Sequence, residues 1–129
     1  MSYMTSFSLT VEDLETRKSI GEVMAEKELN DLANEIEKMD VFSDGDLRYD
    51  ELHTYTTWYS YTEDMCLLSS KYPNLLFVLN GVGEDPADLW KAYYVDGKEQ
   101  MAPGVITFAE FDQGQLVPPK NPRTKYSYS

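Results

Sequence analysis

The chain has 129 residues, 42% of them hydrophobic, which is enough for one domain with a single core and too few for two. It carries 23 acidic and 11 basic residues, a formal net charge of −12 at pH 7. This excess argues against nucleic acid or an anionic membrane as a direct ligand, because both are bound mainly by Lys and Arg. It leaves three explanations for the charge: solubility, a cation ligand or a basic protein partner.

The first predicted element is a strand at residues 3–9, where larger side chains alternate with Ser and Met. Two capping-box patterns, Thr10-x-x-Asp13 and Ser19-x-x-Glu22, then predict that a helix begins near residue 11 or near residue 20. Apolar residues recur at helical spacing after that point and predict one buried stripe on a helix that ends near residue 39: Ala25, Leu29, Leu32, Ile36 and Met39.

The second half of the chain predicts mainly strands. Residues 52–59 are rich in Thr and aromatics and predict a strand, and a short helix follows that Pro73 closes. The apolar run at residues 75–79 predicts the central strand, and Asp96-Gly97 predicts a type I′ hairpin turn. Residues 104–108 are expected to add a strand or to start a helix.

This order of elements predicts an α+β fold in which two helices pack on one antiparallel sheet, with a ferredoxin-like arrangement as the nearest named shape. We expect a single domain over residues 1–116 and a flexible tail over residues 117–129, which are rich in Pro, Ser and Tyr. The chain has no apolar run of about 20 residues and its start does not have the pattern of a signal peptide, so a cytoplasmic location in a host cell is expected.

Three segments together resemble a known group of proteins: WYSYTEDM, KYPNLLFVLNGVGED and DLWKAYYVDGKEQ, within residues 58–112. They resemble small, largely uncharacterised proteins of phages and mobile elements, and more distantly the YubB-type ferredoxin-like domain. The resemblance implies a ferredoxin-like fold and a setting in which anti-CRISPR and other anti-defence proteins occur. It implies no catalytic residues.

The acidic stretch DVFSDGDLRYDEL, residues 40–52, has part of the pattern of a calcium-binding loop. With Gly45 at loop position 6, the ligand positions 1, 5, 7 and 12 fall on Asp40, Asp44, Asp46 and Glu51. Phe42 at position 3 offers no oxygen, Arg48 at position 9 adds a positive charge, and a strand is predicted where the second helix should follow. An acidic turn in which Asp44-Gly45 reverses the chain is therefore favoured, and calcium or small-ligand binding by the four acids is the alternative.

We expect no catalytic residues, no enzymatic activity and no cofactor. Glycines 81 and 83 lie beside Glu84 and Asp85, which would repel a phosphate, so a turn is predicted there. His53 is the only histidine. Cys66 is the only cysteine, which excludes an intrachain disulfide, and its apolar neighbours indicate a core position.

The strongest candidate for a binding site is the acidic helix. Glu28, Asp31 and Glu35 lie on one side of the apolar stripe, and Glu26 and Glu37 lie on the other. Such a column of carboxylates can imitate a phosphate backbone, although an ordinary solvated helix face explains it equally well. The candidate partner-binding residues are Glu26, Glu28, Asp31, Glu35, Glu37, Asp44 and Asp46, with Trp58 and Trp90 as aromatic anchors.

The predicted function is therefore binding and inhibition of a host nucleic-acid-binding defence enzyme, such as a CRISPR effector or a restriction enzyme, by occlusion as a DNA mimic. The partner would be a host nuclease or another basic nucleic-acid-binding protein, without direct contact with nucleic acid or membrane. Two alternatives remain open: a calcium- or small-ligand-binding domain that uses the 40–51 loop, and a structural protein whose charge serves only solubility. The sequence leaves the oligomeric state open.

Overall fold

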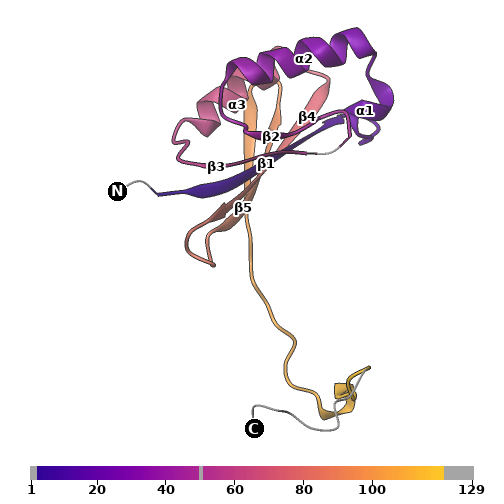
Figure 1. Cartoon of the computed structure of the whole chain (residues 1–129), viewed down its shortest axis with the longest axis vertical. Coiled ribbons are helices and arrows are strands. Elements are labelled where there is room, and N and C mark those ends of the chain that lie inside the picture. Colours follow the sequence, from indigo (N-terminus) through magenta and orange to yellow (C-terminus); the bar gives the residue numbers. More distant parts are fainter. Residues whose placement is uncertain (1–2, 50, 121–129) are drawn as a thin grey trace.

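The computed structural model describes residues 3–49 and 51–120, and in it three α-helices lie on one face of a six-stranded antiparallel sheet (Figure 1). The elements follow in the order β1 (Thr5–Asp13), α1 (Ile20–Val23), α2 (Glu26–Lys38), β2 (Asp44–Gly45), β3 (Leu52–Thr56), α3 (Tyr61–Ser70), β4 (Leu75–Gly83), β5 (Leu89–Val95) and β6 (Lys98–Pro103). A short 3₁₀ helix at Gln113–Gln115 ends the described elements. No helix among these residues is both long and apolar enough to cross a membrane.

The strands lie side by side in the order β2-β3-β1-β4-β5-β6, so β1 and β4 form the centre of the sheet. Side chains alternate between its two faces, and Phe7, Leu9 and Val11 of β1 all point to the face beneath the helices. Their partners on β4 include Leu79, opposite Leu9, and Phe77, opposite Val11. This face holds the core, because Leu9, Phe77 and Leu79 are completely buried there.

The two longer helices cover different parts of the core face. Helix α2 buries Leu29, Leu32 and Ile36 against it, as the apolar stripe predicted, and ends at Lys38, one residue before the expected boundary. Helix α3 buries Met65 and Leu68 and contacts β4, β5 and β6. Thus α2 lies toward the β2 edge of the sheet, next to Leu52 and the β2 segment, and α3 lies toward the β6 edge.

The α+β class and the antiparallel sheet are confirmed, and the order of elements differs from the predicted one. There are three helices, because the four residues of α1 form an additional turn of helix after Ser19. A two-residue edge strand, β2, pairs with β3, and β6 adds an edge on the other side. With these additions the order of helices and strands differs from the predicted one, so the ferredoxin-like topology is not confirmed.

Three local predictions were wrong. Of the two predicted helix starts, the one near residue 20 is confirmed by α1, which begins at Ile20, and the one near residue 11 is wrong. The Thr10-x-x-Asp13 pattern lies within β1, because Val11 packs opposite Phe77 in the core, and the Asp13 carboxylate accepts hydrogen bonds from Thr16 in the following turn. Asp44-Gly45 forms strand β2, so the reversal comes after it, with a turn at residues 47–49. Residues 104–108 form neither a strand nor a helix.

Two glycines hold positions that a larger residue could not take without strain, and the turn predicted at Gly81 and Gly83 follows β4, which ends at Gly83. Asp96 and Gly97 have φ values of 48° and 78°, as the predicted type I′ turn between β5 and β6 requires. Gly81 of β4 lies directly beneath the indole of Trp90 on β5, its paired neighbour. Any side chain at position 81 would occupy the space of that ring.

The chain leaves the sheet after Pro103 and runs away from it as an exposed segment (Figure 1). The predicted domain boundary at residue 117 falls within this segment and stays a prediction. Most of the predicted tail, residues 121–129, lies outside the described residues.

Candidate functional site

The acids of α2 lie on both flanks of the helix, as expected from their spacing. Glu26, Glu28, Asp31 and Glu37 are exposed, because the buried stripe turns the remaining surface of the helix to solvent. Asp44 and Asp46 are also exposed, on β2 and in the turn after it. We call these six residues the acidic surface.

The seventh predicted acid, Glu35, is engaged within the protein. One carboxylate oxygen lies 3.1 Å from Nζ of Lys71, which follows α3, and the other lies 3.7 Å from Nζ of Lys38. The hydrogen bond and the charge of Lys71, and then the charge of Lys38, lower the pKa of Glu35. Sequence analysis missed Lys71, which is remote in the chain and reaches α2 only because the two helices are neighbours.

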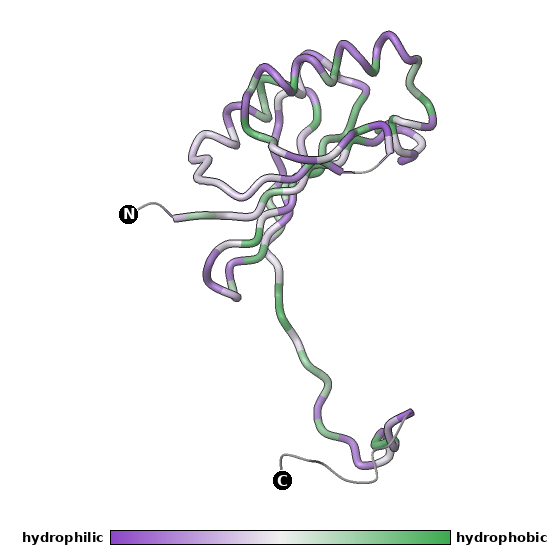
Figure 2. The backbone as a smooth tube through the Cα atoms, viewed as in Figure 1, coloured by the Kyte–Doolittle hydropathy of each residue, from purple (hydrophilic) through white to green (hydrophobic). Residues whose placement is uncertain are grey.

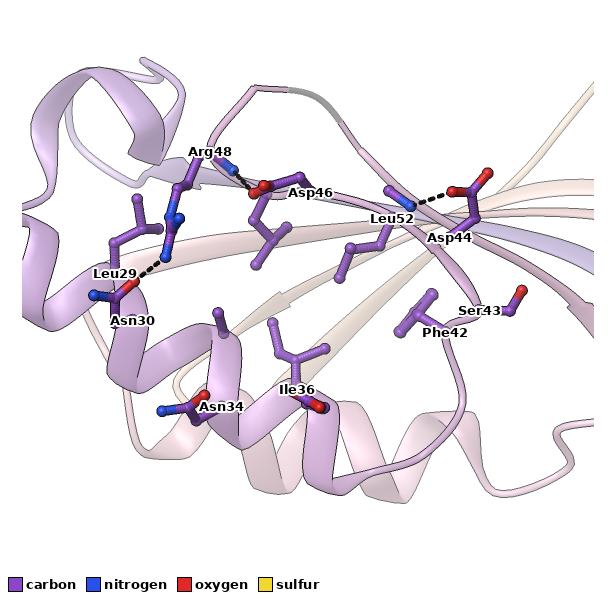
Figure 3. Close-up of a pocket in the computed structure, with 14 residues that line it drawn as sticks. Leu29, Asn30, Asn34, Ile36, Phe42, Ser43, Asp44, Asp46, Arg48 and Leu52 are labelled. Carbon is purple, nitrogen blue, oxygen red and sulfur yellow. Dashed lines mark hydrogen bonds between the residues drawn. The ribbon is translucent and has the colours of Figure 1, made fainter.

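A groove of about 640 Å³ separates α2 from the β2 segment (Figure 3). Its floor is apolar and includes Leu29, Ile36 and Leu52, whose side chains point into the gap between helix and strand. Its rim is polar and includes the three members of the acidic surface nearest to β2, namely Glu37, Asp44 and Asp46. The acidic surface therefore continues from α2 across this groove to the edge of the sheet.

One base lies in this rim. The guanidinium of Arg48 donates a hydrogen bond to the side-chain oxygen of Asn30 on α2, which fixes the loop against the helix (Figure 3). The backbone N–H of Arg48 also donates to the carboxylate of Asp46 at 2.9 Å. This base thus bridges the helix and the loop.

The acids proposed as calcium ligands are used locally. The Asp44 carboxylate accepts from the N–H of Gly45, that of Asp46 accepts from Arg48, and Glu51 lies 3.4 Å from Nε2 of His53. No three metal-ligating side chains come close enough together to hold an ion in the part of the chain that is described. The second helix of a calcium loop is replaced by β3, which pairs antiparallel with β2 so that Leu52 lies opposite Gly45 and His53 opposite Asp44.

The two tryptophans belong to an aromatic cluster on the core face. Trp58 is only 7% exposed, and its indole N–H donates to the Asp64 carboxylate at 2.8 Å. Trp90 is partly buried and stacks on Tyr61 with a centroid separation of 4.8 Å. Phe7 packs edge-on against both tryptophans. Little of Trp58 is left for a partner, so contact with one would fall to Trp90 and its exposed neighbours.

The only cysteine and the only histidine lie on opposite sides of the sheet. Cys66 on α3 packs against the core cluster, and burial raises the pKa of its thiol, which disfavours the reactive thiolate. Thr54 of β3 points into the core, so the neighbouring His53 points to the other face. The fold therefore does not assemble a Cys–His pair from these residues.

No protein-family model, curated protein or solved structure matches this chain. The site must accordingly be judged on its own geometry. That geometry is an anchored helix and an edge strand that expose six carboxylates, three of which, Glu37, Asp44 and Asp46, line an apolar groove.

Proposed function

We propose that this protein binds a basic, phosphate-holding surface of a nucleic-acid-binding enzyme and blocks it by occupying it. The acidic surface would take the place of the phosphates, and the apolar groove beside α2 would add contact area. A host defence nuclease is the proposed target class, in keeping with the resemblance of residues 58–112 to proteins of phages and mobile elements.

The observation that carries this proposal is the free, fixed presentation of the carboxylates. Helix α2 is held by three buried side chains, so Glu28 and Asp31 keep a helical spacing of roughly 4.5 Å along the axis. Among the described residues, the ion pairs made by α2 acids all involve Glu35. Exposed charges that form no ion pair attract a basic partner at a distance, and the ordered helix backbone that carries them needs no further ordering on binding.

A charge that served only solubility would behave differently, and a matched pair of variants separates the two cases. Glu28→Lys/Asp31→Lys reverses two charges on the acidic surface. Glu15→Lys/Glu63→Lys reverses two exposed acids elsewhere, so both variants have a net charge of −8 in place of −12.

The experiment is a pull-down from a defence-competent host lysate with tagged protein, over a salt series and with duplex DNA as competitor. We expect capture of a basic nuclease that salt and DNA both displace. The acidic-surface variant should bind it roughly tenfold more weakly, mainly through a slower association rate, and the control variant should bind almost normally. Equal loss in both variants, or no nuclease captured, would refute the proposal.

A further inference from the structure

The segment that follows β6 exposes an unusual amount of apolar surface. Val105, Phe108, Phe111 and Val117 are each at least 80% exposed, and Ile106 and Leu116 are also exposed. Figure 2 shows these hydrophobic stretches along the part of the chain that runs away from the sheet. Contiguous apolar exposure of this kind marks an interaction site, because scattered single residues are the norm on a soluble surface. We call residues 104–117 the apolar segment.

The same molecule has an unfilled aromatic groove of about 500 Å³ at the end of its core face. The stacked rings of Tyr61 and Trp90 lie in its wall, and the exposed side chains of Tyr59 and Met101 lie at its rim. Tyr59 is 78% exposed although it is flanked by this cluster. Such a groove fits aliphatic and aromatic side chains, which is what the apolar segment offers.

The connection between the two features favours exchange between copies. Pro103 and Gly104 form part of the groove's own rim, and the N–H of Gly104 donates to the carbonyl of Leu89 at 2.7 Å. The segment is thus tied to the sheet at its first residue and leads away from the groove beside which it starts (Figure 1). An extended chain gains about 3.3 Å per residue, so the segment can reach well beyond its own domain.

We propose that the apolar segment of one copy docks in the aromatic groove of a second copy, and that the second copy returns the same contact. A reciprocal exchange closes after two subunits, because each copy gives one segment and fills one groove. The dimer would bury on each side the side chains that the single chain leaves in water. The acidic surface has no part in this contact, since none of its six acids lines the aromatic groove.

Sedimentation velocity tests the dimer directly. We expect a concentration-dependent species of twice the monomer mass. Phe108→Asp/Phe111→Asp on the segment, and Met101→Lys at the groove rim, should each give a monomer with an unchanged circular dichroism spectrum, because all three side chains are exposed. A matched control, Glu110→Gln, should stay dimeric. A monomer at every concentration, or a dimer that resists both sets of changes, would overturn the proposal.

Disulfide trapping distinguishes a second copy from the chain's own groove. In a Cys66→Ala background, Thr107→Cys on the segment is mixed with a separate Ala87→Cys protein, whose residue 87 is exposed and lines the groove. We expect a covalent heterodimer under oxidising conditions, and none when Glu15→Cys replaces Ala87→Cys. A third protein carries both Thr107→Cys and Ala87→Cys in one chain. If only this protein forms a disulfide, and forms it within one chain at high dilution, the segment docks on its own domain and exchange is refuted.

Discussion

The contact between Gly81 and Trp90 is the packing feature on which the structure makes its sharpest prediction. A Cβ added at Gly81 would lie 2.1 Å from a ring carbon of Trp90, whereas ordinary contacts begin at 3.4 Å. In Gly81→Ala the indole would therefore have to move by more than 1 Å. It cannot do so freely, because Tyr61 is stacked on it at 4.8 Å and Phe7 is packed edge-on at 5.9 Å.

The expected loss can be worked from these contacts. Overpacking typically costs about 1–3 kcal/mol, and disturbing an aromatic pair adds about 0.5–1.5 kcal/mol. We expect Gly81→Ala to lower the free energy of unfolding by roughly 2–4 kcal/mol, which a domain of this size survives. In urea this corresponds to a midpoint lower by about 1–2 M, with a changed near-ultraviolet circular dichroism signal from Trp90.

A double-mutant cycle supplies the control. In a Trp90→Ala background the added methyl group meets no ring, so Gly81→Ala should then cost little, and the coupling energy should exceed about 1 kcal/mol. Gly114→Ala, at an exposed position whose new Cβ would come no closer than 3.3 Å to any side chain or backbone atom, should leave the urea midpoint near its original value. An unchanged midpoint for Gly81→Ala, or the same loss in both backgrounds, would show that Trp90 does not lie over this glycine.

Two further predictions concern ionisation. Burial, and then the hydrogen bond from its hydroxyl to Glu99 at 2.7 Å, raise the pKa of Tyr94 well above its usual value of 10.0. The unfolded chain therefore loses the Tyr94 proton above pH 10 while the folded protein keeps it. The free energy of unfolding should fall as the pH rises above 10, by up to about 1.4 kcal/mol per pH unit. Tyr94→Phe should flatten that alkaline decline in urea titrations, and an equally steep decline in the variant would contradict it. Lys71, and less strongly Lys38, hold the pKa of Glu35 down. NMR titration should show Glu35 ionising at lower pH than exposed glutamates. In Lys71→Met the pKa of Glu35 should rise, and the absence of a rise would refute the pairing.

Much of the fold could be predicted from periodicity and turn chemistry. The 3.6-residue stripe Leu29–Leu32–Ile36 placed α2, the continuous apolar run placed β4 at the centre, and Asp96-Gly97 placed the last hairpin. What failed were short patterns whose meaning depends on long-range contacts. Thr10-x-x-Asp13 resembles a helix start, yet burial of Val11 against β4 outweighs the cap, since a core contact is worth more than one capping hydrogen bond.

The candidate site was predictable only in part, for a similar reason. Helical spacing alone shows that Glu28 and Asp31 share a flank, because both lie on one element. It cannot show that Lys71 reaches Glu35, or that Asp64 receives the indole N–H of Trp58, because these pairs depend on how elements pack. A buried indole N–H needs a hydrogen-bond acceptor, and Asp64, six residues after Trp58, supplies it. This nearby carboxylate, which also accepts from Ser60, was the one local signal that Trp58 could be buried in the core.

The two proposals place their contacts on separate sets of residues, and this separation decides how their tests combine. The acidic surface belongs to α2, β2 and the turn after β2, and the aromatic groove is lined by residues of β1, β5, β6, the start of α3 and the loops beside them. Charge reversal at Glu28 and Asp31 should therefore leave the sedimentation of the protein unchanged, and Phe108→Asp/Phe111→Asp should leave a single acidic surface able to bind. If the dimer forms, it presents two acidic surfaces. A partner with two basic sites within reach would then bind the dimer more tightly than the monomeric variant, because the second contact becomes intramolecular and no new kind of contact is needed.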